Sequence, residues 1–485
     1  MKLVSPELHE KTLESALMQF IFPFSVNPGS QKDFIHQLEE DGYRSFSLKN
    51  LDQQHEFYGE EYQVSHRNME RYFLPFTANV IFPHEPDDST FRRLSRRLDY
   101  HCLLKTSYMN IRFTILSADV ILCPFDLGFI TVRTQVKSDL QETLTFTEAL
   151  EFANRFRALQ DITPQDDTTF IVHDDREYAE VEDFLFKCVV SGLLPYLDKR
   201  EMQGAYFETM PYFVDERMYV QAFYAFPEGE EISQEDRYRA GRIDGVNHEG
   251  KPFISSSNKS YIAGYLQGHE YERWAPNTHY VIDDSSFCCI TNIEKRKATE
   301  LANQMYGEFY YGLLLNLFHK IVLLKLSNQY SRISLVKNQE QIEELISEIT
   351  TFSSKYFFLE LVTQSQGREI FIQLRRLFGH VNLYEEVKRT LNDLYKYQDD
   401  SSSRRSNYLL VILTVFAVIS GIYGMNQVID DLKYPINWSA MREYSFFQYL
   451  ALGVTFSGIF VGLSLGVSTL YRWGKELLKN RRRKR

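Results

Sequence analysis

Two long runs without a charged residue lie near the C-terminus and restrict the fold more than any other feature of the chain. The first run covers residues 408–425 and the second covers residues 446–471. A helix rises about 1.5 Å per residue, so about 20 apolar residues cross a hydrocarbon core of about 30 Å. Both runs are therefore predicted to be transmembrane helices rather than a pair of buried core helices.

The charges that flank these runs predict their orientation. Arg404 and Arg405 precede the first run, and residues 472–485 contain eight basic residues and one acidic residue. Basic residues stay on the cytoplasmic side of a membrane. Both chain ends are therefore predicted to be cytoplasmic, in a multi-pass protein of the inner (plasma) membrane of the cell. The loop 426–445 would then face outward.

The basic tail also bears on the choice of partner. The formal charge of the whole chain is −11, which leaves −18 for the residues before the tail. Such an acidic body is a poor nucleic-acid binder, because affinity for nucleic acid depends on cationic side chains that neutralise phosphates. The tail itself is expected to contact the anionic headgroups of the lipid bilayer. We therefore expect a membrane as partner and no nucleic acid.

The chain before the first run is predicted to form a cytosolic body of two parts. Residues 1–290 alternate strand-like apolar runs with helical patterns, which indicates a mixed α/β regulatory domain. Residues 291–405 contain no proline and have a helical composition, which predicts a helical stalk region. Residues 406–471 would form a two-helix pore domain and residues 472–485 a cytosolic tail. The expected class is an α+β membrane protein.

Two local patterns sharpen this prediction. Thr145, followed three residues later by Glu148, predicts a capping box at the start of a helix in the first part. The five cysteines form no CxxC pair and are predicted to be reduced thiols in the core of a cytosolic domain. They are Cys102, Cys123, Cys188, Cys288 and Cys289.

The last cytosolic helix is predicted to continue into the first membrane run. Its apolar stripe in the cytosol consists of Leu383, Val387, Leu391 and Leu394. The same helical spacing leads on to Leu410, Thr414, Ala417 and Gly421. Three of these four are small or weakly polar, where lipid contact would favour large aliphatic residues. Such a stripe either allows close helix packing or lines a pore, and the pattern fits both.

The first run ends in a glycine, a methionine and an amide: Gly424, Met425 and Asn426. Mg²⁺ holds its water shell tightly, so a pore selects it at least cost through neutral carbonyl oxygens that accept hydrogen bonds from those waters. Asn426 is therefore predicted to contact the hydrated cation. Asp430 and Asp431 follow, and they would concentrate cations at the pore mouth. Because two spans cannot enclose a pore, several copies must assemble.

This C-terminal arrangement resembles the CorA family of Mg²⁺ channels. The resemblance rests on the sequence Tyr423–Asn426 (YGMN), the long helix before it and the basic tail, and it covers about residues 380–485. It implies a homo-oligomer of five chains, a selectivity filter formed by Gly424, Met425 and Asn426, and Mg²⁺ as the transported or regulatory ion. No enzymatic activity is expected, because the sequence has no metal-ligand spacing such as H-E-x-x-H. The sequence QVIDDLKYP stands here in place of the family's acidic Met-Pro-Glu element.

A second set of polar residues lies among aromatic residues in the cytosolic part. It comprises Arg242, Asp244, His248, Arg273, His279 and Asp283. They are either polar loop residues of an α/β domain or the lining of a ligand pocket, above all Arg242, Asp244, Arg273 and His279. CorA-like proteins with enlarged soluble domains also occur beside CRISPR systems as membrane effectors that a nucleotide messenger opens. A small nucleotide ligand in antiviral defence is thus one alternative, and a membrane-anchored protein with non-conducting spans is another.

Overall fold

The computed structural model describes residues 8–137, 143–160, 169–198, 217–332, 339–424 and 439–450, together with residues 453, 454, 457 and 460. By its internal contacts the chain divides into two compact units, residues 1–391 and residues 392–485. Residue 290, the expected end of the α/β domain, lies on a strand of the central sheet. Most of the expected stalk region belongs to the same first unit as this sheet.

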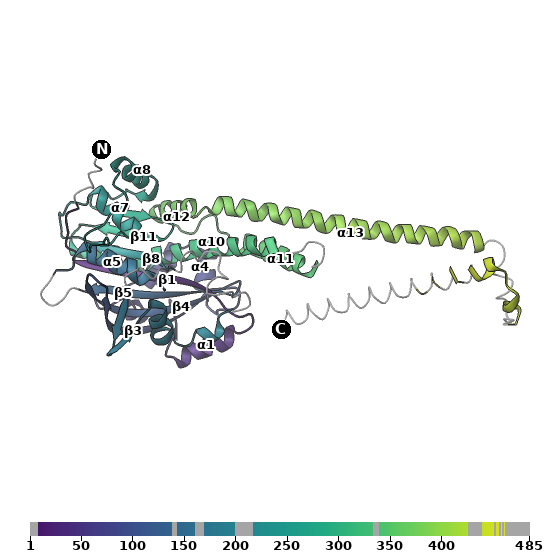
Figure 1. Ribbon diagram of the computed structural model, residues 1–485, viewed down its shortest axis with the longest axis horizontal. Coiled ribbons are helices and arrows are strands. Elements are labelled where there is room, and N and C mark those ends of the chain that lie inside the picture. The colour runs from purple at the N-terminus through teal and green to yellow at the C-terminus, as the bar shows by residue number, and fades with distance from the viewer. Residues whose placement is uncertain are drawn as a thin grey trace. The chain divides into compact units, whose positions relative to one another are not determined.

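One sheet of 11 strands forms the centre of the first unit (Figure 1). Its strands are β1 (Ser15–Ser25), β2 (Arg44–Ser45), β3 (Arg92–Lys105), β4 (Asn110–Cys123), β5 (Leu127–Lys137), β6 (Phe170–His173), β7 (Arg176–Tyr178), β8 (Tyr219–Ala225), β9 (Glu270–Tyr271), β10 (Thr278–Ile282) and β11 (Ser286–Thr291). The order is β7-β6-β3-β4-β5-β1-β8-β11-β10-β9, with β2 beside β3. The pair β8–β11 is parallel and the other pairs are antiparallel. Strand β1 is buried on both faces, so its sequence is nearly continuously apolar.

Helices cover this sheet and fill the rest of the first unit. They are α1 (Gln31–Glu40), α2 (Gln53–Glu56), α3 (His66–Tyr72), α4 (Pro75–Ile81), α5 (Phe146–Arg157), α6 (Val181–Phe184), α7 (Gln234–Arg242), α8 (Lys259–His269), α9 (Lys295–Tyr306), α10 (Glu308–Arg332), α11 (Gln339–Lys355) and α12 (Ser365–Leu377). Helix α13 (His380–Gly424) begins in the first unit and continues into the second. The helical character predicted after residue 291 is therefore confirmed.

The predicted capping box opens α5. The Thr145 hydroxyl accepts a hydrogen bond from the backbone N–H of Glu148 at 3.2 Å, and the Glu148 carboxylate accepts one from the backbone N–H of Thr145 at 2.8 Å. This exchange satisfies two N–H groups that the first turn would otherwise leave without a partner.

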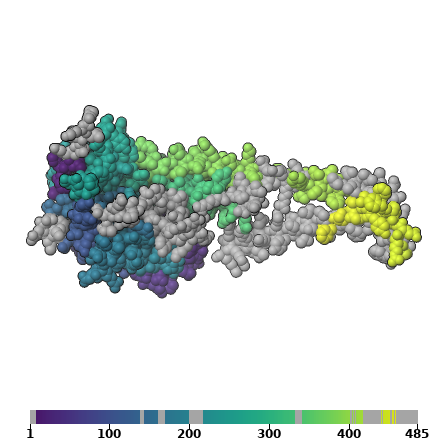
Figure 2. Space-filling view, in the orientation of Figure 1, coloured from purple at the N-terminus to yellow at the C-terminus, as the bar shows by residue number. Residues whose placement is uncertain are grey.

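Helix α5 packs on the apolar face of the sheet through aromatic rings. The rings of Phe152 and Phe113 lie 4.7 Å apart, and those of Phe156 and Phe20 also lie 4.7 Å apart. Each fully buried ring contributes about 1.5–3 kcal/mol. The N-terminal segment joins the same unit through Lys11, whose ammonium lies 2.6 Å from the carboxylate of Asp236 in α7. Figure 2 shows the purple N-terminal atoms beside teal atoms of this region.

Helices α9 and α10 cover the opposite face through a buried polar layer. The Asp119 carboxylate lies 3.0 Å from the guanidinium of Arg93 and 2.7 Å from that of Arg133, and all three side chains are buried. Arg93 also donates to the hydroxyl of Tyr311 on α10 at 2.8 Å. Burial alone would raise the pKa of Asp119, but the two arginines together lower it. Removing one partner would leave a buried charge unpaired, so this layer fixes α10 on the sheet.

The fold is thus mixed α/β with one large sheet, as predicted for the cytosolic part. The five cysteines are unpaired; four are buried and Cys188 is half-buried. Among the described residues, one helical stretch, Lys295–Ser331, is long and apolar enough to cross a membrane, and 78% of its most apolar part is buried. That burial identifies it as a core helix. The first expected membrane span, residues 408–425, coincides with the C-terminal part of α13, which is described up to Gly424. Most of the second expected span, residues 446–471, lies outside the described residues.

Candidate functional sites

The C-terminal part of α13 exposes apolar side chains in every direction around the helix. The consecutive residues Leu410, Val411, Ile412 and Leu413 are 61%, 60%, 45% and 63% exposed. Four consecutive helical residues turn through a full circle. A helix on the surface of a soluble protein keeps one polar face toward water. This segment therefore needs an apolar environment on all sides, either lipid or other helices.

The predicted small-residue stripe lies on this same segment. The backbone of α13 is helical through positions 410, 414, 417 and 421, so the predicted spacing of these positions along one face is retained. The hydroxyl of Thr414 donates to the carbonyl oxygen of Leu410 at 2.7 Å. Such a bond within the helix satisfies a hydroxyl in apolar surroundings.

The predicted selectivity filter begins where the described part of α13 ends. Gly424 is the last residue of the helix. Met425, Asn426, Asp430 and Asp431 lie outside the described residues. Among the residues that are described, no group of three or more His, Cys, Asp or Glu side chains is arranged to hold a metal ion.

Arg242 of the predicted ligand set pairs with another residue that the sequence pointed to. Its guanidinium lies 2.7 Å from the carboxylate of Asp283, and the hydroxyl of Tyr265 donates to the same carboxylate at 2.9 Å. Burial tends to raise the pKa of Asp283, but the backbone N–H of Asp284, Arg242 and Tyr265 outweigh it and lower that pKa. The pair connects the end of α7 to the turn after β10.

The other predicted ligand residues have separate partners. Asp244 accepts hydrogen bonds from the backbone N–H and the hydroxyl of Ser255 at 2.7 and 2.8 Å. The ring of His279 contacts the carboxylate of Glu270 at 2.5 Å. Arg273 donates to the hydroxyl of Ser365 at 3.0 Å. The structure thus joins Arg242 to Asp283, while these three residues serve contacts within the fold.

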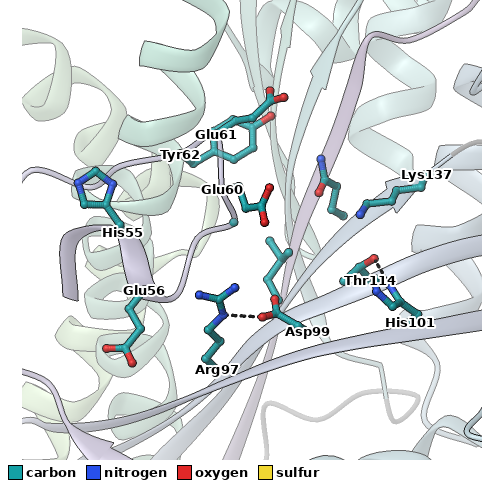
Figure 3. A pocket seen from close by; sticks show the side chains of 13 residues that line it. His55, Glu56, Glu60, Glu61, Tyr62, Arg97, Asp99, His101, Thr114 and Lys137 are labelled. Carbon is teal, nitrogen blue, oxygen red and sulfur yellow. Dashed lines mark hydrogen bonds and ion pairs between the residues drawn. The ribbon is translucent and has the colours of Figure 1, made fainter. Parts of the chain in front are cut away.

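A polar cavity lies elsewhere, between the loop from α2 to α3 and the strands β3, β4 and β5 (Figure 3). Its volume is about 540 Å³. Polar and charged residues dominate its walls: His55, Glu60, Arg97, Asp99, His101 and Lys137. No local motif marks this site, because its walls come from four separate segments spread over residues 55–137.

A smaller cavity of about 260 Å³ lies beside the start of α10. Glu308, the first residue of α10, lines it together with Tyr72 of α3 and Gln366 of α12. Burial raises the pKa of Glu308 to about 7. This carboxyl group therefore exchanges its proton near neutral pH.

No family model, curated protein or solved structure matches this chain. We therefore infer its function from its own residues and geometry.

Proposed function

We propose that this chain forms a homo-oligomeric membrane channel for a divalent cation, with Mg²⁺ as the principal candidate, and that the first compact unit is its cytosolic regulatory domain. The supporting observation is α13, one continuous helix of 45 residues whose residues 410–413 are apolar and exposed around the whole circumference. Exposed apolar surface costs about 25 cal/mol per Å² in water. Insertion of this segment into the lipid of the inner membrane removes that cost.

The same helix supplies a face suited to a pore. Positions 410, 414, 417 and 421 lie along one face of α13 and carry mostly small or weakly polar residues. In the proposed channel this face lines the pore and the other faces contact lipid or neighbouring spans. Two spans per chain are too few to surround a pore, so several copies assemble, and resemblance to the CorA family favours five.

The proposed filter lies at the outer end of this pore. A ring of Asn426 side chains, one from each copy, presents neutral carbonyl oxygens to the waters around the cation. Gly424 ends the described helix just before this residue, and glycine permits the turn that would direct the amide inward. Asp430 and Asp431 would raise the local cation concentration without binding the dehydrated ion.

The beginning of α13 is held in the first unit, which would connect regulation to the pore. Val387 of the predicted stalk stripe is buried. Ser327 of α10 donates to the carboxylate of Glu386 at 2.8 Å. A shift of α10 would therefore be transmitted to the start of α13, which continues as one unbroken helix toward the proposed pore.

The Asn426→Ala variant tests this proposal. We expect purified oligomers in liposomes to lose selective Mg²⁺ flux while they keep their size in detergent, because the substitution removes the amide ring and little packing surface. Asn437→Ala, another asparagine of the same loop, serves as the matched control and should keep selectivity. Unchanged Mg²⁺ selectivity in Asn426→Ala would exclude the filter, and no flux through the wild-type oligomer would favour a membrane anchor with non-conducting spans.

A further inference from the structure

We propose that the cavity between the α2–α3 loop and strands β3, β4 and β5 binds a small zwitterion of the α-amino acid type. The ligand would carry one anionic and one cationic group on a single small molecule. The proposed pore does not use this cavity, so the inference goes beyond the channel function and can fail independently of it.

The cavity lies over the part of the sheet's polar face that aromatic side chains do not cover. Successive side chains on a strand point to opposite faces, so Arg133, Gln135 and Lys137 of β5 share one face. The first of these is covered, because the rings of Tyr58 and Tyr310 each lie 5.2 Å from the guanidinium of Arg133. The other two line the cavity. The sheet thus offers polar groups to a ligand where the aromatic cover ends.

Two opposite charges in the cavity have no partner among the residues that the structure describes. Figure 3 shows the ammonium of Lys137 and the carboxylate of Glu60 pointing into the cavity from opposite sides. Within the described part of the chain, neither side chain forms a hydrogen bond or an ion pair. The side-chain amide of Gln135, on the cavity floor, is likewise without a partner among those residues. A ligand with one anionic and one cationic group would satisfy both charges.

The remaining charged residues of the cavity are already paired. Arg97 lies 2.5 Å from Asp99, and Glu61 lies 3.4 Å from Lys295. Glu56 pairs with Arg44. His101 is held by the hydroxyl of Thr114 at 3.2 Å. Among the described cavity residues, one charge of each sign is therefore left over, which suits a zwitterion better than a polyanion or a metal ion.

The dimensions of the cavity agree with this ligand class. Its volume of about 540 Å³ lies within the range of about 300–1,000 Å³ that is typical of small-molecule sites. The buried part of its floor is formed by Thr114 and Leu116. The loop that forms the opposite wall turns at Gly59, whose φ of +93° favours glycine. The two unpaired charges thus lie on opposite walls of the cavity, Lys137 on the strand floor and Glu60 on the loop.

Calorimetric titration of the full-length protein in detergent tests the ligand class. The probes are L-glutamine and L-leucine, which carry one charge of each sign, and each is paired with an analogue that lacks one of these charges. Glutaramate lacks the ammonium group of glutamine, and isoamylamine lacks the carboxylate of leucine. We expect saturable binding of at least one amino acid, with its analogue at least tenfold weaker. No saturable heat from either amino acid, or equal binding of an amino acid and its analogue, would overturn the proposal.

Single substitutions then test the two residues. Lys137→Gln and Glu60→Gln should each weaken binding of the amino acid at least tenfold. The preference for the amino acid over its analogue should also be lost selectively, since Lys137→Gln should bind leucine no better than the wild type binds isoamylamine. Lys32→Gln and Glu39→Gln on α1, which do not line the cavity, are the matched controls. All four side chains are exposed, so the variants should fold, and thermal unfolding verifies this. Unchanged affinity in either cavity variant would overturn the assignment of that charge.

Discussion

Helix α10 and the C-terminal part of α13 are both strongly apolar, yet they lie in opposite surroundings. Leu314 and Leu317 of α10 are 0% and 1% exposed, whereas residues 410–413 of α13 are 45–63% exposed. Both segments are rich in the aliphatic residues that a bilayer favours. Apolar content therefore cannot separate a core helix from the proposed membrane span. The two segments differ instead in the polar residues that each contains.

Helix α10 carries polar groups whose partners are in the protein. The side-chain amide of Asn316 donates to the carbonyl oxygen of Gly312 at 2.7 Å, and the ring of His319 contacts the carbonyl oxygen of Tyr356 at 2.7 Å. Burial lowers the pKa of His319 to about 3, so the ring is neutral at physiological pH. Residues 408–424 of α13 contain no charged residue and no histidine. Lipid could not supply the partner that His319 finds in Tyr356, whereas residues 408–424 contain no histidine or charged group that would need such a partner.

Introducing a charge into each helix should give the largest difference between them. Leu314→Arg buries a guanidinium without a partner, at a cost comparable to the whole stability of a domain, about 5–15 kcal/mol. We expect loss of the folded first unit, seen as loss of its protease-resistant fragment. Val411→Arg should leave that fragment intact but reduce membrane integration, because a central arginine costs about 2.5–3.5 kcal/mol on insertion scales.

Membrane fractionation and limited proteolysis of both full-length variants measure the two effects separately. Leu314→Lys and Val411→Lys repeat the comparison with a different cation. A folded first unit in Leu314→Arg, or an unfolded one in Val411→Arg, would break the distinction between the two helices.

Truncating a leucine in each helix should give a smaller contrast of the same kind. Leu317→Ala removes buried side-chain volume and should lower the free energy of unfolding of the first unit by about 2–5 kcal/mol. Leu413→Ala removes an exposed side chain of the second unit and should change that quantity by less than about 0.5 kcal/mol. Denaturant unfolding in detergent measures both values. Equal losses would show that residue 413 packs in the first unit.

Local patterns predicted local structure, while contacts between distant segments were not visible in the sequence. The capping box of Thr145 and Glu148 depends on neighbouring residues, so it was found in advance. The position of β1 between β5 and β8 joins segments about 110 and 200 residues apart and leaves no local signal. The sequence singled out Arg242 and Asp283 as polar residues among aromatics, but it could not show that they pair. The cavity around Lys137 and Glu60 was missed for the same reason.

The smallest expected effect concerns pH and the first residue of α10. Burial raises the pKa of Glu308 from its ordinary value of 4.5 to about 7. Between these two pH values the folded state binds a proton that the unfolded state has released. The protonated carboxyl group therefore makes its full contribution to the free energy of unfolding below about pH 4.5. This contribution is lost as the pH rises through about 7.

Glu308→Gln should remove this loss, since glutamine is neutral at every pH and has nearly the same shape. We expect the variant to gain about 3 kcal/mol relative to the wild type at pH 8, and almost nothing at pH 4. Urea unfolding at a series of pH values measures this difference. Glu340→Gln, on an exposed position of α11, is the matched control and should show no such trend. A difference between Glu308→Gln and the wild type that does not change with pH would mean that the carboxyl group is ionised in the folded protein, and that the cavity beside α10 is open to water.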